Sequence, residues 1–144
     1  MSPSERQGWM GLLARAPSGW LAALMPALPD HDLLRAPEVG AVMVRGRTGA
    51  TGAPFNLGEM TVTRCSLRLA DGTVGHAWVQ GRDKGHARRA ALVDALMQGP
   101  GAGQTRATVL DPLAAEEAAR RATRAAKAAA TKVEFFTLVR GEDQ

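Results

Sequence analysis

Arginine, glycine and threonine gather at residues 45–52, in the sequence Arg-Gly-Arg-Thr-Gly-Ala-Thr-Gly. Glycines let backbone N–H groups surround a phosphate, and flanking guanidinium groups bind its oxygens in pairs. Arg45, Arg47, Thr48 and Gly49 are therefore candidate anion-binding residues. The spacing is not a Walker A loop, because no Gly-Lys-Ser/Thr follows, and no helix begins directly after it as a dinucleotide-binding fingerprint requires. A solvated turn between two strands is the alternative, and the motif alone favours that plainer interpretation.

A second basic group lies at residues 80–86, where a strand is expected to give way to a helix. Helix N-termini attract anions, and Arg82 and Lys84 add positive charge there. Arg82, Lys84 and His86 are candidates for a phosphate contact, as is Arg64 on the preceding strand. In the alternative interpretation, Asp83 only caps the helix and the neighbouring charges are solvated.

The sequence offers no catalytic or metal-ligating set. His31, His76, His86 and Cys65 lack the short-range ligand spacing of zinc sites. Ser66 and Cys65 have no identifiable base beside them, and neither lies in a strained nucleophile elbow. We therefore predict no catalytic residue and no metal site, and the chain does not look like a self-sufficient enzyme.

Composition limits the class of protein. The 144 residues have the length of one domain, and 18 basic against 14 acidic residues give a net charge of +4. One cysteine, no signal peptide and no run of about 20 apolar residues together predict a cytoplasmic protein without a membrane span. The arginine content leaves a basic nucleic-acid-binding module as an alternative, although tyrosine is absent and no aromatic residues interleave with the charges.

The N-terminal half predicts helices followed by strands. Residues 1–30 read as two short helices, the first with a capping box at Ser4-Glu5-Arg6-Gln7 and the second capped by Ser18. Residues 38–81 read as strands, with a Gly-rich loop at 46–54. A change of parity in the second strand suggests a β-bulge at Thr63 and Arg64, and Asp71-Gly72 is a hairpin turn.

The C-terminal half predicts two longer helices and a last strand. Residues 83–98 read as a helix capped by Asp83, with His86, Ala90, Val93 and Met97 on one face. Residues 99–110 read as a linker, 111–131 as an Ala-rich helix, and 132–140 as a strand inside the sheet. Because alanine buries little area, the helix either approaches a neighbour closely or awaits a partner chain, and the alternative is a mostly solvated helix held by alanine propensity. The whole is a single α+β domain, mainly an antiparallel sheet of about four strands.

Several blocks of sequence, in this order, resemble PhnG, the G subunit of the bacterial carbon–phosphorus lyase core complex. They are Arg47-Thr48-Gly49 with its Gly-rich turn, Gly58-Glu59-Met60-Thr61-Val62-Thr63-Arg64, Asp71-Gly72-Thr73-Val74-Gly75-His76-Ala77-Trp78-Val79-Gln80-Gly81-Arg82-Asp83-Lys84, Ala90 to Met97, and Phe135-Phe136-Thr137-Leu138-Val139-Arg140-Gly141. The resemblance extends from Trp9 to Gly141.

The resemblance implies one subunit of a transferase that displaces adenine from ATP with a phosphonate, so that the phosphonate becomes attached at the anomeric carbon of the ribose. The co-substrate would be ATP with Mg, and the partners would be the H, I and J subunits, with the L subunit needed functionally. The chain alone would be inactive, since catalytic residues of that family are looked for on the I subunit. Arg45, Arg47, Arg64, Arg82 and Lys84 would screen the charges of the triphosphate and the phosphonate, or would bind acidic surfaces of a partner.

Overall fold

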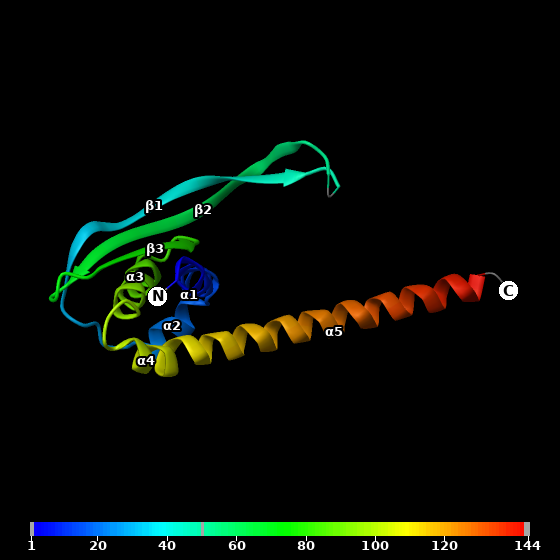
Figure 1. Cartoon of the computed structure of the whole chain (residues 1–144). Helices are drawn as coiled ribbons and strands as arrows, with labels where there is room; N and C mark the ends of the chain where they lie inside the picture. Colours follow the sequence, from blue (N-terminus) through cyan, green and yellow to red (C-terminus); the bar gives the residue numbers. More distant parts are fainter. Residues whose placement is uncertain (1, 50, 143–144) are drawn as a thin grey trace. The chain divides into compact units, whose positions relative to one another are not determined.

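The computed structural model describes residues 2–49 and 51–142, except for the side chains of residues 133–142. The α+β fold class is confirmed, and the described residues form three strands rather than four. The elements, in chain order (Figure 1), are α1 (Pro3–Arg15), α2 (Ser18–Leu24), β1 (His31–Arg47), β2 (Pro54–Leu69), β3 (Val74–Gln80), α3 (Lys84–Leu96), α4 (Ala102–Thr105), the π-helix η1 (Arg106–Leu110) and α5 (Asp111–Glu142).

The chain divides into two compact units, Met1–Leu113 and Ala114–Gln144. That residues 1–144 form a single domain therefore stays a prediction. Within the described part of the chain, no helix is long and apolar enough to cross a membrane.

Both N-terminal helices are present, but the predicted caps are wrong. The N-cap of α1 is Ser2 and not Ser4: the Ser2 hydroxyl accepts the N–H of Glu5 at 3.2 Å, and the Glu5 carboxylate accepts the N–H of Ser2 at 2.9 Å. Pro3 then fills the first helical position, where a missing N–H costs nothing. The sequence contains two overlapping capping boxes, one from Ser2 to Glu5 and one from Ser4 to Gln7. The proline directly after Ser2 favours the earlier one. In α2, Ser18 is already helical and no side chain caps the helix.

The three strands form one antiparallel sheet in the order β1-β2-β3. Strand β1 begins at His31, seven residues before the predicted start at residue 38, and it passes through Pro37. A proline is tolerated there because β1 is an edge strand, and the pairing with β2 is irregular between Arg35 and Glu38.

The predicted bulge in β2 is misplaced. The extra residue lies in β1, where the three steps from Arg35 to Glu38 face the two steps from Ser66 to Arg64. From Gly58 to Leu69, strand β2 keeps its parity, because Thr63 and not Val62 shares the core face with Cys65. Its own bulge is at Leu57, between the pairs Val44–Gly58 and Arg45–Asn56. The Thr63 side chain is fully buried, and its hydroxyl donates to the carbonyl of Gly81 at 2.8 Å, which satisfies the polar atom.

The hairpin between β2 and β3 is confirmed, although its loop has three residues rather than two. Leu69 donates its N–H to the carbonyl of Thr73, so residues 70–72 form the loop. Gly72 has a φ of +92°, which favours glycine, and the Asp71 carboxylate accepts the N–H of Thr73 at 2.9 Å. The extra loop residue shifts the register of β3 by one position.

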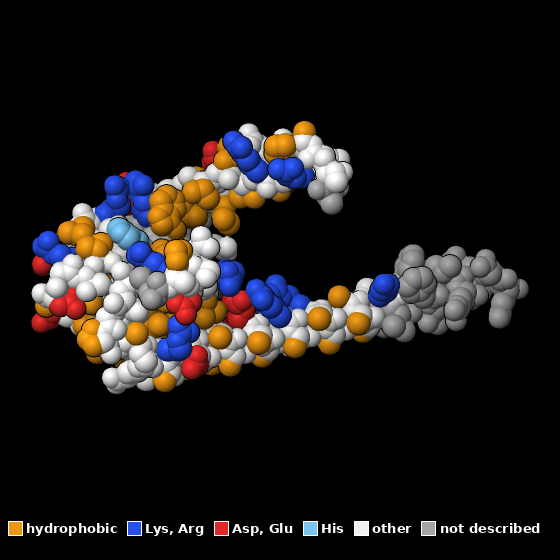
Figure 2. Space-filling model, viewed as in Figure 1, with side chains coloured by type: hydrophobic (Ala, Val, Ile, Leu, Met, Phe, Trp, Pro, Cys, Tyr) orange, Lys and Arg blue, Asp and Glu red, His pale blue; other side chains and the backbone are white. Residues whose placement is uncertain are grey.

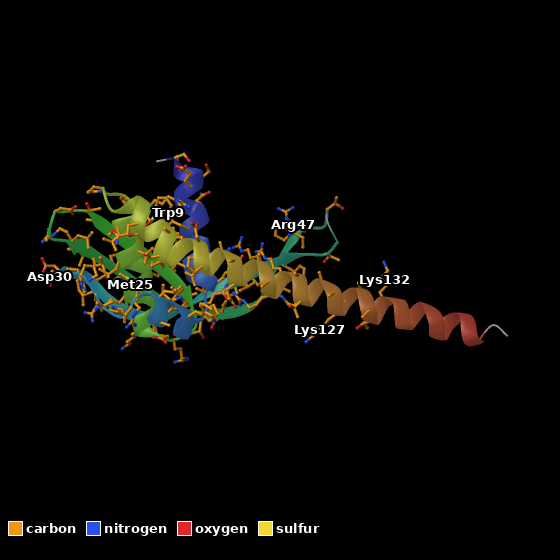
Figure 3. The ribbon with its side chains drawn as sticks, turned by 90° about the horizontal axis from the view of Figure 1, so that it is seen from below. Trp9, Met25, Asp30, Arg47, Lys127 and Lys132 are labelled. Atoms are coloured by element: carbon orange, nitrogen blue, oxygen red, sulfur yellow. The ribbon has the colours of Figure 1, made fainter. Side chains whose placement is uncertain are left out.

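Helices α1, α2 and α3 cover one face of the sheet, and the core lies between these two layers (Figure 1). The predicted helix at 83–98 is confirmed, and all four residues of its predicted apolar face are buried. Strand β3 approaches α3 closely at Gly75, where any β-carbon would overlap the carbonyl of Ala91. Figure 3 shows side chains crowded around Trp9 and Met25 of this core. Small side chains therefore allow helix and sheet to approach closely.

Two predictions for the C-terminal half are wrong. The supposed linker at 99–110 contains α4 and η1, and Val109 and Leu110 are buried in the core. The supposed strand at 132–140 continues α5, which runs to Glu142. A short apolar run fits a strand or a helix equally well, and extending an existing helix avoids the cost of a new nucleus.

Helix α5 is stabilised by its own sequence over the part that carries described side chains. Glu116 pairs with Arg120 at 2.7 Å and Glu117 with Arg121 at 2.8 Å, both four residues apart. Every side chain from residue 118 to residue 132 is exposed, and Lys127 and Lys132 project from it in Figure 3. High alanine propensity and these ion pairs are thus its main local support.

Candidate functional site

Strands β1 and β2 extend beyond β3 as a two-stranded ribbon (Figure 1). The last pair between β2 and β3 joins Val62 to Gln80, whereas pairing between β1 and β2 continues to Arg47 and Pro54. We call the protruding part, residues 41–49 and 51–61, the β-arm. The predicted Gly-rich loop lies at its end.

The first group of anion-binding candidates lies at this end. The Arg45 and Arg47 side chains are exposed, and neither makes an ion pair with another described residue. Thr48 and Gly49 follow in the turn, where Gly49 has a φ of +65°. The N–H of Gly52 donates to the carbonyl of Thr48, so it closes the turn and is not free to cradle a phosphate. The tip therefore presents two guanidinium groups that have no ion-pair partner among the described residues.

The second group lies where β3 gives way to α3. Arg82 and Lys84 are exposed. Asp83 caps the helix as predicted: its carboxylate accepts the N–H of His86 at 3.0 Å, and this bond lowers the pKa of the carboxyl below its ordinary value. The His86 ring is buried, and its Nε2 donates to the carbonyl of Leu13 at 2.7 Å. This histidine is therefore placed to join α3 to α1 rather than to meet an anion.

The structure does not bring these two groups together. Gly81 donates its N–H to the carbonyl of Thr61 at the base of the β-arm. Pro54 lies seven residues farther along β2, a length of about 23 Å at the usual rise of a strand. The tip and the junction are thus separate basic surfaces of unit 1, and no single phosphate reaches both.

Arg64, the remaining candidate, lies on the face of the sheet away from the helices. Its guanidinium donates to Glu38 through Nε at 3.3 Å and Nη2 at 3.2 Å, and it lies 5.7 Å from the centre of the Trp78 ring. Arg35 donates to the same carboxylate at 3.1 Å. The Arg64 and Arg35 hydrogen bonds hold the pKa of Glu38 below its ordinary value. The charge of Arg64 is therefore already compensated within the sheet.

Sequence reasoning missed a hydrogen-bonded pair on this outer face. Ser66 and His76 are cross-strand partners, with 2.8 Å between the hydroxyl oxygen and Nδ1. A two-residue turn at Asp71-Gly72 would have opposed Ser66 to Ala77, so the three-residue loop creates the pair. Within residues 2–49 and 51–142, no carboxylate forms a hydrogen bond with the His76 ring. The pair lacks the third group that orients the base in a nucleophilic triad.

A buried carboxylate organises the helical layer. The fully buried Asp94 side chain accepts four hydrogen bonds: two from Arg6, at 2.8 and 3.1 Å, one from Trp9 Nε1 at 2.8 Å, and one from the N–H of His76 at 2.9 Å. The bond to Asp94 raises the pKa of Arg6 above its ordinary value. Asp94 follows Val93 and lies four residues after Ala90, which places it on the predicted apolar face of the helix. An acidic residue on that face was a signal in the sequence for a buried, hydrogen-bonded carboxylate.

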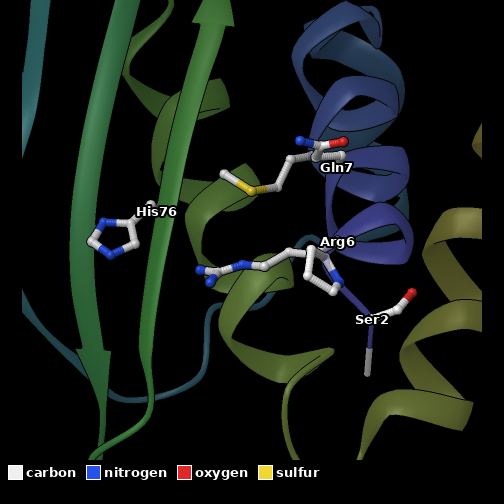
Figure 4. A pocket seen from close by; sticks show the side chains of 6 residues that line it. Ser2, Arg6, Gln7 and His76 are labelled. Carbon is white, nitrogen blue, oxygen red and sulfur yellow. The ribbon is translucent and has the colours of Figure 1, made fainter.

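An open depression of about 440 Å³ lies beside this cluster, between the start of α1 and β3. In Figure 4, Arg6 extends from α1 toward the strand, whereas the His76 ring projects on the other side of it. Arg6 is the charged side chain of the lining, and Asp94 already pairs with it. The depression is therefore poorly suited to a multiply charged anion.

The described residues contain no group of three or more His, Cys, Asp or Glu side chains that could hold a metal ion. Cys65 is buried, and burial raises the pKa of its thiol above the ordinary value, which disfavours the reactive thiolate. What the described surface offers is positive charge at the arm tip and at the β3–α3 junction.

Comparison with known proteins identifies a matching family and similar proteins. The family model described as phosphonate metabolism protein PhnG matches residues 4–141. A protein of Rhizobium meliloti (strain 1021), named alpha-D-ribose 1-methylphosphonate 5-triphosphate synthase subunit PhnG, is 45% identical over 143 residues. That alignment covers 97% of this chain and 92% of the relative.

Proposed function

Because the chain belongs to the PhnG family of phosphonate metabolism proteins, we propose that it is one subunit of a synthase that transfers the ribose triphosphate of ATP to an organic phosphonate. In this reaction a phosphonate oxygen bonds to C1′ of the ribose, the bond from C1′ to adenine breaks, and adenine leaves with a proton. The observation that supports this most strongly is 45% identity across 97% of the chain to a protein named as a subunit of such a synthase.

The proposed role of this chain is assembly and anion handling rather than covalent catalysis. ATP, with Mg, and a phosphonate bring several negative charges together, so displacement at the ribose depends on screening and fixed orientation. Arg45, Arg47, Arg82 and Lys84 are exposed, and their positive charge is available either to these anions or to acidic surfaces of a partner subunit. The partners are the H, I and J subunits, with the L subunit needed for activity, and the catalytic groups belong to them.

The test is reconstitution. The chain is co-expressed with the H, I, J and L subunits, and adenine release from ATP is measured with and without methylphosphonate. We expect phosphonate-dependent release from the full set, a large loss when this chain is omitted, and none from the chain alone. Equal phosphonate-dependent release without this chain would overturn the proposal, and so would turnover by the isolated chain.

A further inference from the structure

The two faces of the β-arm differ in chemistry. One face carries the cross-strand pairs Val42–Met60, Val44–Gly58 and Gly46–Phe55, and Leu57 at the bulge lies over Gly46. The other face carries the pairs Met43–Glu59, Arg45–Asn56 and Arg47–Pro54. One face is therefore wholly apolar, and the opposite face is mostly polar and basic.

None of the described helices and strands of unit 1 covers the apolar face. Leu57 is 62% exposed and Phe55 is 43% exposed, whereas Leu67 of the same strand is fully buried under the helices. A two-stranded ribbon is marginal by itself in water, and it needs a further layer on its apolar side to be stable. The β-arm has the composition of a packed strand pair without the layer that would pack it.

The exposed patch continues along the outer face of the sheet to Trp78, which is 51% exposed. Between the β-arm and Trp78 lies a cavity of about 200 Å³, lined in part by Val42, Val62 and Trp78. At roughly 200 Å² for a whole aromatic side chain, Trp78 and Phe55 together leave about 200 Å² uncovered, and Leu57, counted generously at the same size, raises the total to about 300 Å². A stable interface needs about 800 Å² from each partner. Pairing two copies through this flat face alone would therefore bury too little.

A partner that encloses the ribbon would gain more area, because Met43 on the opposite face is also 51% exposed. It would also meet Arg45 and Arg47, which have no ion-pair partner among the described residues. Figure 2 shows basic side chains beside hydrophobic ones along this arm. Both features fit a cleft with aliphatic walls and carboxylates at its inner end.

We propose that the β-arm inserts into such an apolar, acid-ended cleft of another synthase subunit, and that Leu57 and Phe55 are its anchors. This rests on the proposed function, which supplies the other subunit. Arg45 and Arg47 pair with carboxylates of that subunit, so charge fixes the depth of insertion while apolar burial supplies the affinity.

The first test compares Leu57→Asp with Leu34→Asp. Leu34 is the matched control, because it is 52% exposed on β1 but lies outside the β-arm. Each variant carries an affinity tag, is co-expressed with the other subunits, and is purified as the complex. We expect Leu57→Asp to lower partner recovery at least tenfold and Leu34→Asp to leave it near the wild-type level. Equal recovery with both variants overturns the inference, and unchanged circular dichroism of the isolated chains shows that both are folded.

The second test replaces both tip arginines, Arg45→Glu with Arg47→Glu, in the full complex. Carboxylates in the cleft predict weaker assembly that recovers in part at high salt, because salt screens the repulsion between the like charges that then meet across the interface. A complex of normal composition with a raised KM for ATP would overturn this part, because the arginines would then serve substrate phosphate.

The mass of the isolated chain in solution tests whether a second copy of the chain, rather than another subunit, covers the apolar face. We expect a monomer; a dimer that Leu57→Asp dissociates and Leu34→Asp does not would assign the face to a second copy and overturn the inference. Failure of the wild-type chain to bind any of the other subunits would instead refute the proposed function.

Discussion

Replacing Asp94 with alanine tests whether the buried carboxylate holds α1 to α3 and β3. The substitution removes the acceptor of four hydrogen bonds and leaves the N–H groups of Trp9 and His76 without a partner. Each buried unsatisfied donor costs about 1–3 kcal/mol. The loss of the partner of Arg6 costs less free energy, because this side chain is 30% exposed and its guanidinium can hydrogen-bond to water instead. We expect a loss of about 3–5 kcal/mol, in the range seen when one partner of a buried ion pair is removed.

The assay is equilibrium unfolding of the isolated chain in urea, followed by circular dichroism, with thermal melting as a second measurement. A loss of that size corresponds to a fall in Tm of roughly 10–15 °C for a domain of this length. Asp32→Ala is the control, because Asp32 is 79% exposed and pairs with Arg68 at 3.8 Å, so its removal leaves the midpoint nearly unchanged. If Asp94→Ala and Asp32→Ala unfold at the same urea concentration, the cluster does not hold the layers together and the reasoning fails.

Three further predictions concern the same unit. Gly75→Ala should destabilise the chain by more than about 2 kcal/mol in the same urea assay, because its methyl group would overlap the carbonyl of Ala91; an unchanged midpoint would show that β3 moves away freely. Asp83→Asn should flatten the dependence of stability on pH. The pKa of Asp83 is lowered in the fold, so its contribution to stability is present above about pH 4 and is lost as pH falls toward the folded pKa; a wild-type slope in the variant would contradict this. Cys65 should resist iodoacetamide at pH 8 in the folded chain and react when urea unfolds it, as mass spectrometry would show; fast labelling of the native chain would disprove its burial.

Features set by local spacing were predictable from the sequence. The face of α3 from His86 to Met97, the cap at Asp83 and the hairpin at Asp71-Gly72 each depend on a few neighbouring residues, and all three are present. The start of β1 could not be read in the same way, because Pro37 suggests a break and only the pairing with β2 carries the strand through it. Residues 132–140 failed for a related reason, since their apolar run has no local feature that separates strand from helix.

The candidate anion-binding residues show the limit of reading charge from sequence. All eight candidates were chosen for positive charge or for a place in a glycine turn or at a helix start. Two of them are already engaged within the fold, because Arg64 is held by Glu38 and His86 is buried against Leu13. Those pairings depend on strand register and on helix packing over long sequence separations. A pattern of positive charge therefore predicted where cations occur, and only the fold shows which of them are already neutralised.

At the β-arm, arginines with no ion-pair partner among the described residues lie beside exposed apolar side chains. Elsewhere in unit 1 several residues of the same types are satisfied internally: Arg6 by Asp94, Arg64 by Glu38, and the core face of β2 by α3. If the 20 residues of the β-arm were surrounded by water in the functional protein, their exposed apolar side chains would be a cost that nothing offsets. The incompleteness of the arm is more simply explained as half of an interface, whose other half the synthase partner supplies.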